Sequence, residues 1–207
     1  QERRRSMRIV AFNGSPRRNG NTFQTLNHML ERLAARGCET ELVQMGAEAH
    51  GCIGCGLCRK NQQERCFQKS DPRYNEWFGK MLEADGVILG SPVYAGWLTP
   101  VMKGFVEKAA FMARGPIKRG GKYTVLRNKV GVAVAPTRRS GGIQTLQSMI
   151  ALFAQSQMIM PCGGAWPITS LGSMDTDAFS NDPEGVKIVD RLADNMMDVL
   201  EKLHRAR

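Results

Sequence analysis

Short apolar runs alternate along the chain with longer segments in which apolar residues recur at helical spacing. The runs have the length of strands and little polar alternation, which is typical of strands covered on both faces. Five strands are expected, at residues 7–12, 40–45, 86–90, 129–135 and 158–160. Helices are expected at residues 21–36, 72–84, 100–112, 143–154 and 183–203. Because parallel strands are joined by right-handed helical crossovers, this alternation predicts a doubly wound α/β fold with a parallel sheet and helices on both faces.

The length and composition indicate a single soluble domain over residues 7–207, with a hydrophobic fraction of 42%. No stretch approaches the roughly 20 apolar residues of a membrane-spanning helix, so no membrane association is expected. Residues 1–6 are mostly charged and precede only a short apolar run. We expect them to be a frayed tail or a sequence added for expression rather than a secretory signal. A cytoplasmic protein is therefore expected.

The loops after the first, third and fourth expected strands are rich in Gly, Pro, Ser and Thr. In doubly wound sheets, ligands bind beyond the carboxyl ends of the strands, where these loops lie. The first loop, NGSPRRNGNT at residues 13–22, joins a strand to a helix N-terminus and so predicts a phosphate site. It matches neither the three-glycine dinucleotide fingerprint nor the Walker loop. The alternative is an ordinary turn whose helix is capped by Asn21 or Thr22.

Basic residues dominate the charge, with a formal net value of +10. Eight Lys and Arg side chains and no acid fall within residues 111–139. Such a segment favours an anionic ligand, either a phosphorylated cofactor or a nucleic acid. A solvated surface without a ligand is the alternative.

Four of the six cysteines lie within fifteen residues, at Cys52, Cys55, Cys58 and Cys66. The first three follow the two-residue spacing with which bacterial ferredoxins bind a [4Fe–4S] cluster, and the fourth lies farther off. Zinc is less favoured because its sites usually come as two separated pairs, and disulfides are less favoured in a reducing compartment. Cys38 and Cys162 stand apart and are expected to be buried structural residues.

The segments GSPRRNGNT and EADGVILGSPVYAGWLTPVMKGFVEK, with the cysteine cluster between them, resemble the flavodoxin-like NAD(P)H-dependent FMN reductase family. Within that family they are most similar to the iron–sulfur flavoproteins, and the resemblance covers residues 7–165. It implies a flavodoxin-like five-stranded sheet of order 2-1-3-4-5, with a cysteine-rich insertion at residues 51–71 after the second strand. It also implies a noncovalently bound FMN. Relatives that keep some of the cysteines without a cluster leave a cluster-free chain open.

The resemblance also assigns site residues. The phosphate contacts fall on Ser15, Arg17, Asn21 and Thr22. The ring is placed between the second and third loops, and the residues assigned there are Pro92, Val93, Tyr94, Ala95, Gly96, Trp97, Pro136, Thr137 and Gly142. An isoalloxazine needs a flat apolar wall, which Tyr94 or Trp97 can provide, although simple packing or a subunit contact would also explain these aromatic residues. The expected metal ligands are the four clustered cysteines.

The function implied is that of a flavin oxidoreductase, in which NAD(P)H passes hydride to FMN and electrons leave to a small-molecule acceptor. Ferredoxin is a further expected partner if the cluster is present. Relatives complete their flavin sites with a neighbouring subunit, so a homodimer or homotetramer is expected. We assign no catalytic acid or base, because the cofactor carries the chemistry.

Three other functions stay open on the sequence alone. The first is a cluster-free NAD(P)H-dependent FMN or quinone reductase. The second is a non-enzymatic flavodoxin-like electron carrier, although such carriers are typically acidic. The third is nucleic-acid binding, prompted by the basic residues. No helix-turn-helix, aromatic-basic motif or paired zinc finger accompanies these charges, so no specific nucleic acid is expected.

Overall fold

Four parallel strands form the centre of the computed structural model, which describes residues 6–61, 63–69, 72–171, 173, 175 and 177–205. The strands are β1 (Arg8–Asn13), β2 (Glu39–Gln44), β3 (Gly86–Gly90) and β4 (Val130–Val134), in the order β2-β1-β3-β4. The helices are α1 (Asn21–Ala35), α2 (Leu57–Lys60), α3 (Arg73–Glu83), α4 (Pro100–Ala113), α5 (Gly115–Lys118), α6 (Gly142–Gln155) and α7 (Pro183–Arg205). The predicted parallel α/β architecture is confirmed.

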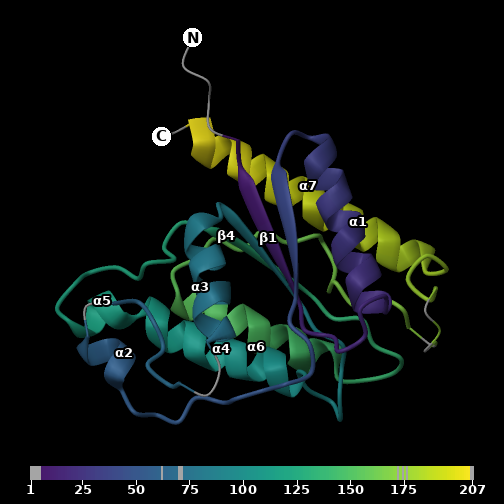
Figure 1. Ribbon diagram of the computed structural model, residues 1–207. Coiled ribbons are helices and arrows are strands. Elements are labelled where there is room, and N and C mark those ends of the chain that lie inside the picture. The colour runs from purple at the N-terminus through teal and green to yellow at the C-terminus, as the bar shows by residue number, and fades with distance from the viewer. Residues whose placement is uncertain are drawn as a thin grey trace.

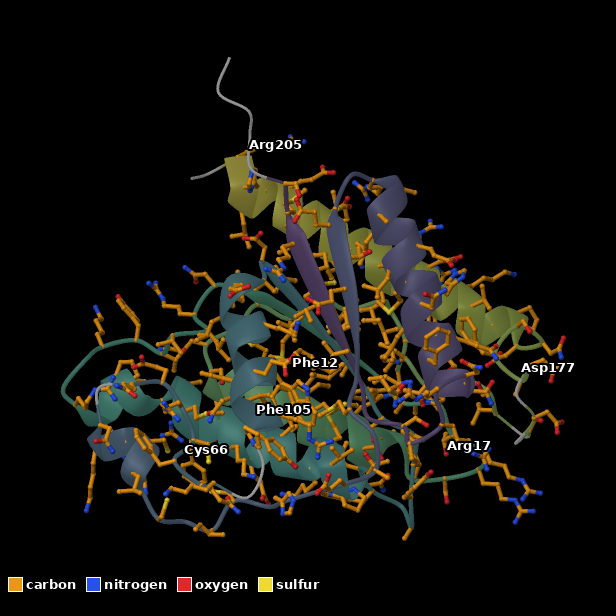
Figure 2. The ribbon with its side chains drawn as sticks, in the orientation of Figure 1. Phe12, Arg17, Cys66, Phe105, Asp177 and Arg205 are labelled. Carbon is orange, nitrogen blue, oxygen red and sulfur yellow. The ribbon has the colours of Figure 1, made fainter. Side chains whose placement is uncertain are left out.

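Two helical layers cover the sheet, as Figure 1 shows. Helices α1 and α7 pack on one face, against Ile9 and Ala11 of β1. Helices α3, α4 and α6 pack on the other face, against Val10 and Phe12. The ring of Phe105 from α4 lies 4.9 Å from that of Phe12, a contact at the centre of Figure 2. The central strands are buried on both faces, which explains why they read as unbroken apolar runs.

The expectation of a fifth strand at residues 158–160 is wrong for the described residues. Ile159 forms only an isolated parallel bridge with Val130. Pro161, two residues later, has no N–H group to continue the hydrogen bonding between strands, and the chain leaves the sheet there. The chain returns later: the N–H groups of Ala135 and Thr137 donate to the carbonyls of residues 167 and 169, at 3.0 and 2.9 Å. A looped segment therefore takes the place of the fifth strand.

The strands end in a common row. Asn13 pairs with Gln44 on one side and with Gly90 on the other, and Gly90 pairs with Val134. The loops after β1, β3 and β4 therefore leave the sheet along one edge. The cysteine-bearing segment lies between β2 and α3, and it contains the short helix α2, which the sequence did not indicate. In the described ranges, no helix has both the length and the apolar character to cross a membrane.

Helix α4 lies very close to the segment that precedes the cysteines, and Gly104 makes this approach possible. A Cβ atom at Gly104 would lie 2.8 Å from Tyr74 Oη and 2.9 Å from the His50 carbonyl oxygen. We predict that Gly104→Ala lowers the free energy of unfolding by about 1–3 kcal/mol through overpacking, despite alanine's higher helix propensity. The control is Gly79→Ala in α3, where a Cβ would meet no atom within 4 Å. That variant should gain about 0.5–1 kcal/mol, and equal urea midpoints for both would contradict the prediction.

A second prediction concerns Glu41, which joins three elements. Its carboxylate accepts hydrogen bonds from Lys80 at 2.6 Å and Arg8 at 3.3 Å. The Lys80 hydrogen bond, with help from Arg8, holds the pKa of Glu41 below its ordinary value of 4.5. A lowered folded-state pKa stabilises the fold above pH 4.5, and this contribution disappears as the pH falls through the folded-state pKa. Glu41→Gln should therefore melt lower at pH 7 and lose less stability between pH 5 and pH 3. Glu39→Gln, at an exposed site on the same strand, should melt like the native chain at each pH.

Candidate functional site

The loop after β1 is shaped by a buried network behind it. Asn13, fully buried, donates to Gln44 Oε1 at 2.7 Å and accepts from the Ser15 N–H at 3.0 Å. Gln44 donates in turn to the Ser15 carbonyl at 2.6 Å. Thr99, from the end of the second loop, donates to the Gly14 carbonyl at 2.7 Å. The loop is thus held by the end of β2 and by the residue that precedes α4, and these three supporting side chains were not identified from the sequence.

The N-terminus of α1 opens directly onto this loop. Its N-cap position is Gly20, and no side chain caps the helix, so the alternative of an Asn21 or Thr22 cap is wrong. The Asn21 side chain is used elsewhere: it donates to the carbonyl of Asp175 at 2.7 Å and accepts from the N–H of Phe179 at 3.0 Å. Uncapped N–H groups at a helix N-terminus are a ready anion site.

The second loop folds into a tight turn. Tyr94 and Trp97 exchange backbone hydrogen bonds of 2.9 and 3.0 Å, and Ala95 and Gly96 between them have φ of 49° and 82°. Positive φ at both central positions is typical of a type I′ turn. The third loop packs against it, because a Cβ at Gly141 would lie 2.7 Å from both Gly96 Cα and Val93 Cγ1. The two loops therefore form one continuous wall.

One cavity of about 190 Å³ collects most of the predicted binding residues. Those that line it are Ser15, Arg17, Asn21, Thr22, Pro92, Val93, Tyr94, Pro136 and Thr137. Four others do not line it: Ala95, Gly96, Trp97 and Gly142. Trp97 instead lines a groove along α4 and α6, and Gly142 lines a neighbouring cavity. Tyr94 is 44% exposed, so its ring is available as a wall of the first cavity.

One side of this cavity was not predicted from the sequence. Ser170, Ser173 and Asp175 line it together with the loop residues. They belong to the segment that takes the place of the fifth strand, so a rule based on strand ends could not point to them. The Ser and Asp residues crowded into 169–177 were the available signal.

A second cavity contains the clustered cysteines. Cys52, Cys55, Cys58 and Cys66 all line it, and Lys108 and Phe111 of α4 form part of its wall. Between the cysteines, Gly54 and Gly56 have φ of 68° and 72°, the left-handed conformation that glycine adopts without cost. Figure 2 shows Cys66 well apart from Arg17 of the first cavity.

Side chains from α3 and α4 hold both ends of the cysteine segment. Glu107 accepts a hydrogen bond from the Cys52 N–H at 3.2 Å and forms an ion pair with Lys103 at 2.7 Å. Asn75 accepts from the Cys66 N–H at 2.7 Å and donates to the Cys66 carbonyl at 3.0 Å. The first and last cysteines are thereby fixed relative to the two helices.

The four thiols are near neighbours without forming a closed ligand set. Burial raises the pKa of the Cys58 thiol, and the adjacent Cys52, Cys66 and Cys55 raise it further. Within the part of the chain that the structure describes, no three or more His, Cys, Asp or Glu side chains converge enough to hold a metal ion. The donor types and their shared cavity suit an iron–sulfur cluster, and binding one would require the four thiols to come closer together.

The two separate cysteines differ from each other. Cys38 is buried, as predicted. Cys162 is exposed, so the prediction that it is buried is wrong. It lies where the chain has left the sheet after Pro161, and Asn195 from α7 donates to its carbonyl. No core element covers its thiol there.

Comparison with known proteins places this chain in a family. The profile of the family described as NADPH-dependent FMN reductase matches residues 7–171. The chain belongs to the NADPH-dependent FMN reductase family. It is therefore a flavin-dependent oxidoreductase, as the resemblance implied.

Individual relatives agree with this assignment. An iron-sulfur flavoprotein of Methanocaldococcus jannaschii is 36% identical over 157 residues, covering 74% of this chain and 75% of that protein. One of Methanosarcina thermophila is 30% identical over 204 residues, covering 97% of this chain and 99% of that protein. The solved flavodoxin, WrbA-like protein of Agrobacterium tumefaciens is 15% identical, with 94% of this chain and 99% of that one covered and a TM-score of 0.53. That likeness shows the flavodoxin-like fold.

The strand-end cavity of this FMN reductase family member fits a flavin nucleotide. The uncapped N–H groups of α1 and the guanidinium of Arg17 suit a phosphate. Tyr94 offers an aromatic face, and Thr137 lines the same cavity from the third loop. The cavity also contains a buried hydroxyl without a partner among the described residues, that of Ser170. Its chemistry therefore matches a ligand with an anionic end and an apolar ring.

We predict that Arg17→Ala weakens FMN binding about tenfold or more, because a charge-assisted hydrogen bond to phosphate is lost. The affinity for riboflavin, which has no phosphate, should hardly change. The matched control is Arg18→Ala, which removes the adjacent exposed guanidinium outside the cavity lining. Recovery of flavin fluorescence on release measures both affinities. Equal losses in the two variants would show that only the general positive charge matters.

Proposed function

We propose that this protein is an iron–sulfur flavoprotein that moves electrons between NAD(P)H or ferredoxin, bound FMN, a [4Fe–4S] cluster and a small acceptor. The observation that carries the proposal is the pairing of two cavities in one chain. One is built from the strand-end loops of the family, and the other is lined by all four clustered cysteines. The names of the two curated relatives above, each an iron-sulfur flavoprotein, support the same conclusion.

The residues of the first cavity bind and orient. The α1 N-terminus and Arg17 would hold the phosphate of FMN. Tyr94 and the packed second and third loops would cover its ring and exclude water from it. Arg138 and Arg139 are placed to attract the phosphates of NAD(P)H. Bound FMN would itself supply hydride acceptance and single-electron transfer.

The residues of the second cavity would hold the cluster. Cys52, Cys55, Cys58 and Cys66 supply four thiolates, the ligand set of a [4Fe–4S] centre. Glu107 and Asn75 keep the backbone at the first and last cysteines in place. Gly54 and Gly56 allow the chain to wind between the thiols. Lys108, largely buried, lines the same cavity and donates to the His50 carbonyl at 2.5 Å, just before the first cysteine.

A cluster-free NAD(P)H-dependent FMN or quinone reductase is the second candidate. The observation that favours it is the arrangement of the thiols, which do not converge as a metal-ligand group among the described residues. In that case the four cysteines would serve as structural or redox-active thiols.

The proposal extends to the setting in which the protein acts. We infer a homodimer or homotetramer, because large apolar side chains near the loops are exposed, including Tyr94, Trp97 and Trp166. Ferredoxin and a small-molecule electron acceptor are the proposed redox partners, and no specific nucleic acid is among them. A reducing cytoplasm is the compartment in which free thiols of this kind persist.

The test is an anaerobic purification followed by a visible spectrum and assays of iron, sulfide and FMN on one sample. We expect FMN, about four irons per chain, and bleaching of the flavin by NAD(P)H or reduced ferredoxin. Cys58→Ser should lose iron and sulfide and keep FMN. Cys162→Ser, which alters an exposed thiol outside the cysteine cavity, should keep all three.

The outcomes separate the candidates. FMN without iron, still reduced by NAD(P)H, would replace the proposal with the cluster-free reductase. Bound FMN that neither NAD(P)H nor ferredoxin reduces would contradict both.

A further inference from the structure

Ser170 lies in the strand-end cavity with its hydroxyl unused. The residue is 2% exposed, and its Oγ is buried without a hydrogen-bond partner among the described residues. A buried hydroxyl left without a partner costs free energy, so native proteins rarely keep one. Because Ser170 lines the cavity, a bound molecule could provide the missing partner.

The backbone of Ser170 is in an unfavourable conformation. Its φ is +62°, in the left-handed region that residues other than glycine seldom adopt. Asp182 holds it there: one carboxylate oxygen accepts from the Ser170 N–H, and the other accepts from the Gly185 N–H in the first turn of α7, both at 2.8 Å. Strained conformations fixed by their surroundings occur preferentially at binding sites.

The surroundings also fix the position of Ser170 relative to the loops. The carbonyl of Thr169 accepts a hydrogen bond from the Thr137 N–H of the third loop at 2.9 Å. The Thr169 hydroxyl lies 3.3 Å from that of Thr25 on α1. Ser170 is therefore held between the third loop and the helix whose N-terminus faces the phosphate loop.

We propose that Ser170 is a flavin nucleotide-binding residue, whose Oγ hydrogen-bonds to an oxygen of the ribityl-phosphate portion of FMN. Asp182 is its positioning residue, because it holds the strained backbone of Ser170 at the cavity lining. This inference rests on the FMN site of the proposed function and does not depend on the cluster. It adds a fourth wall to a site that the family motifs assign to three loops.

The experiment compares Ser170→Ala and Ser170→Gly with the native holoprotein. Release of FMN on dilution, followed by flavin fluorescence, gives its Kd, and competition with riboflavin gives the second affinity. Both variants should weaken FMN binding, by about two- to tenfold if the partner is a neutral ribityl hydroxyl and by more than about tenfold if it is the phosphate. Riboflavin binding should weaken equally in the first case and stay unchanged in the second.

Two control variants separate binding from folding. Ser156→Ala removes another buried, unpartnered hydroxyl that lies outside the cavity lining, and Asn128→Gly places glycine at another site of positive φ. Neither should change the Kd for FMN. Glycine adopts positive φ without cost, so a loss of affinity in Ser170→Gly does not come from added backbone strain.

Unchanged FMN affinity in both Ser170 variants would overturn this inference while leaving the proposed function intact. Failure of the native chain to bind FMN would overturn both. If the native chain binds FMN normally but contains no iron, only the proposed cluster would be contradicted.

Discussion

The register of four parallel strands is the constraint on which the site depends. Gln44, Asn13, Gly90 and Val134 end in one row, so three loops leave the sheet together. Gly90 allows this close fit, since a Cβ there would lie 2.8 Å from Leu26 of α1. Its carbonyl accepts the Gly14 N–H at 2.8 Å, which joins the first loop to the neighbouring strand. A slip of one residue would break these bonds and separate the loops that form the cavity.

The sequence predicted those parts of the molecule that local pattern determines. Strands β1, β3 and β4 are largely apolar and buried, and the longer helices have apolar residues at helical spacing, so the type and approximate limits of these elements could be assigned from period alone. The absence of the fifth strand could not be predicted in this way. It depends on which distant residues form hydrogen bonds with the backbone at the end of β4. The bonds to residues 167 and 169 decide this, and they join segments about thirty residues apart. Cys162 was misjudged for the same reason, since its predicted burial assumed a strand beside it.

The residues of the binding loops were predicted from the sequence, but the side chains that hold those loops in place were not. Short motifs located Ser15, Arg17, Tyr94 and Thr137, because glycine, hydroxyl and basic residues at strand ends have a direct chemical meaning. Asn13 and Glu107 carry no such signal, since Asn13 bonds to Gln44 and Glu107 to the Cys52 N–H, partners that only the folded chain brings near. Ser170 belongs with them: its importance depends on a φ angle and on a missing partner, neither of which is visible in sequence.

Helix α4 connects the two cavities. It begins at Pro100, immediately after the loop that carries Tyr94, and Phe111 near its other end lines the cysteine cavity. Eleven residues of α-helix separate these points, about 16 Å along the axis. Its centre is fixed to the sheet by the Phe12–Phe105 contact and to the cysteine segment through Gly104 and Glu107. Because one helix is held at all these points, the packing of the core determines the spacing between the cavities. Groups bound in the two cavities would therefore be held at a spacing that the packing of α4 determines.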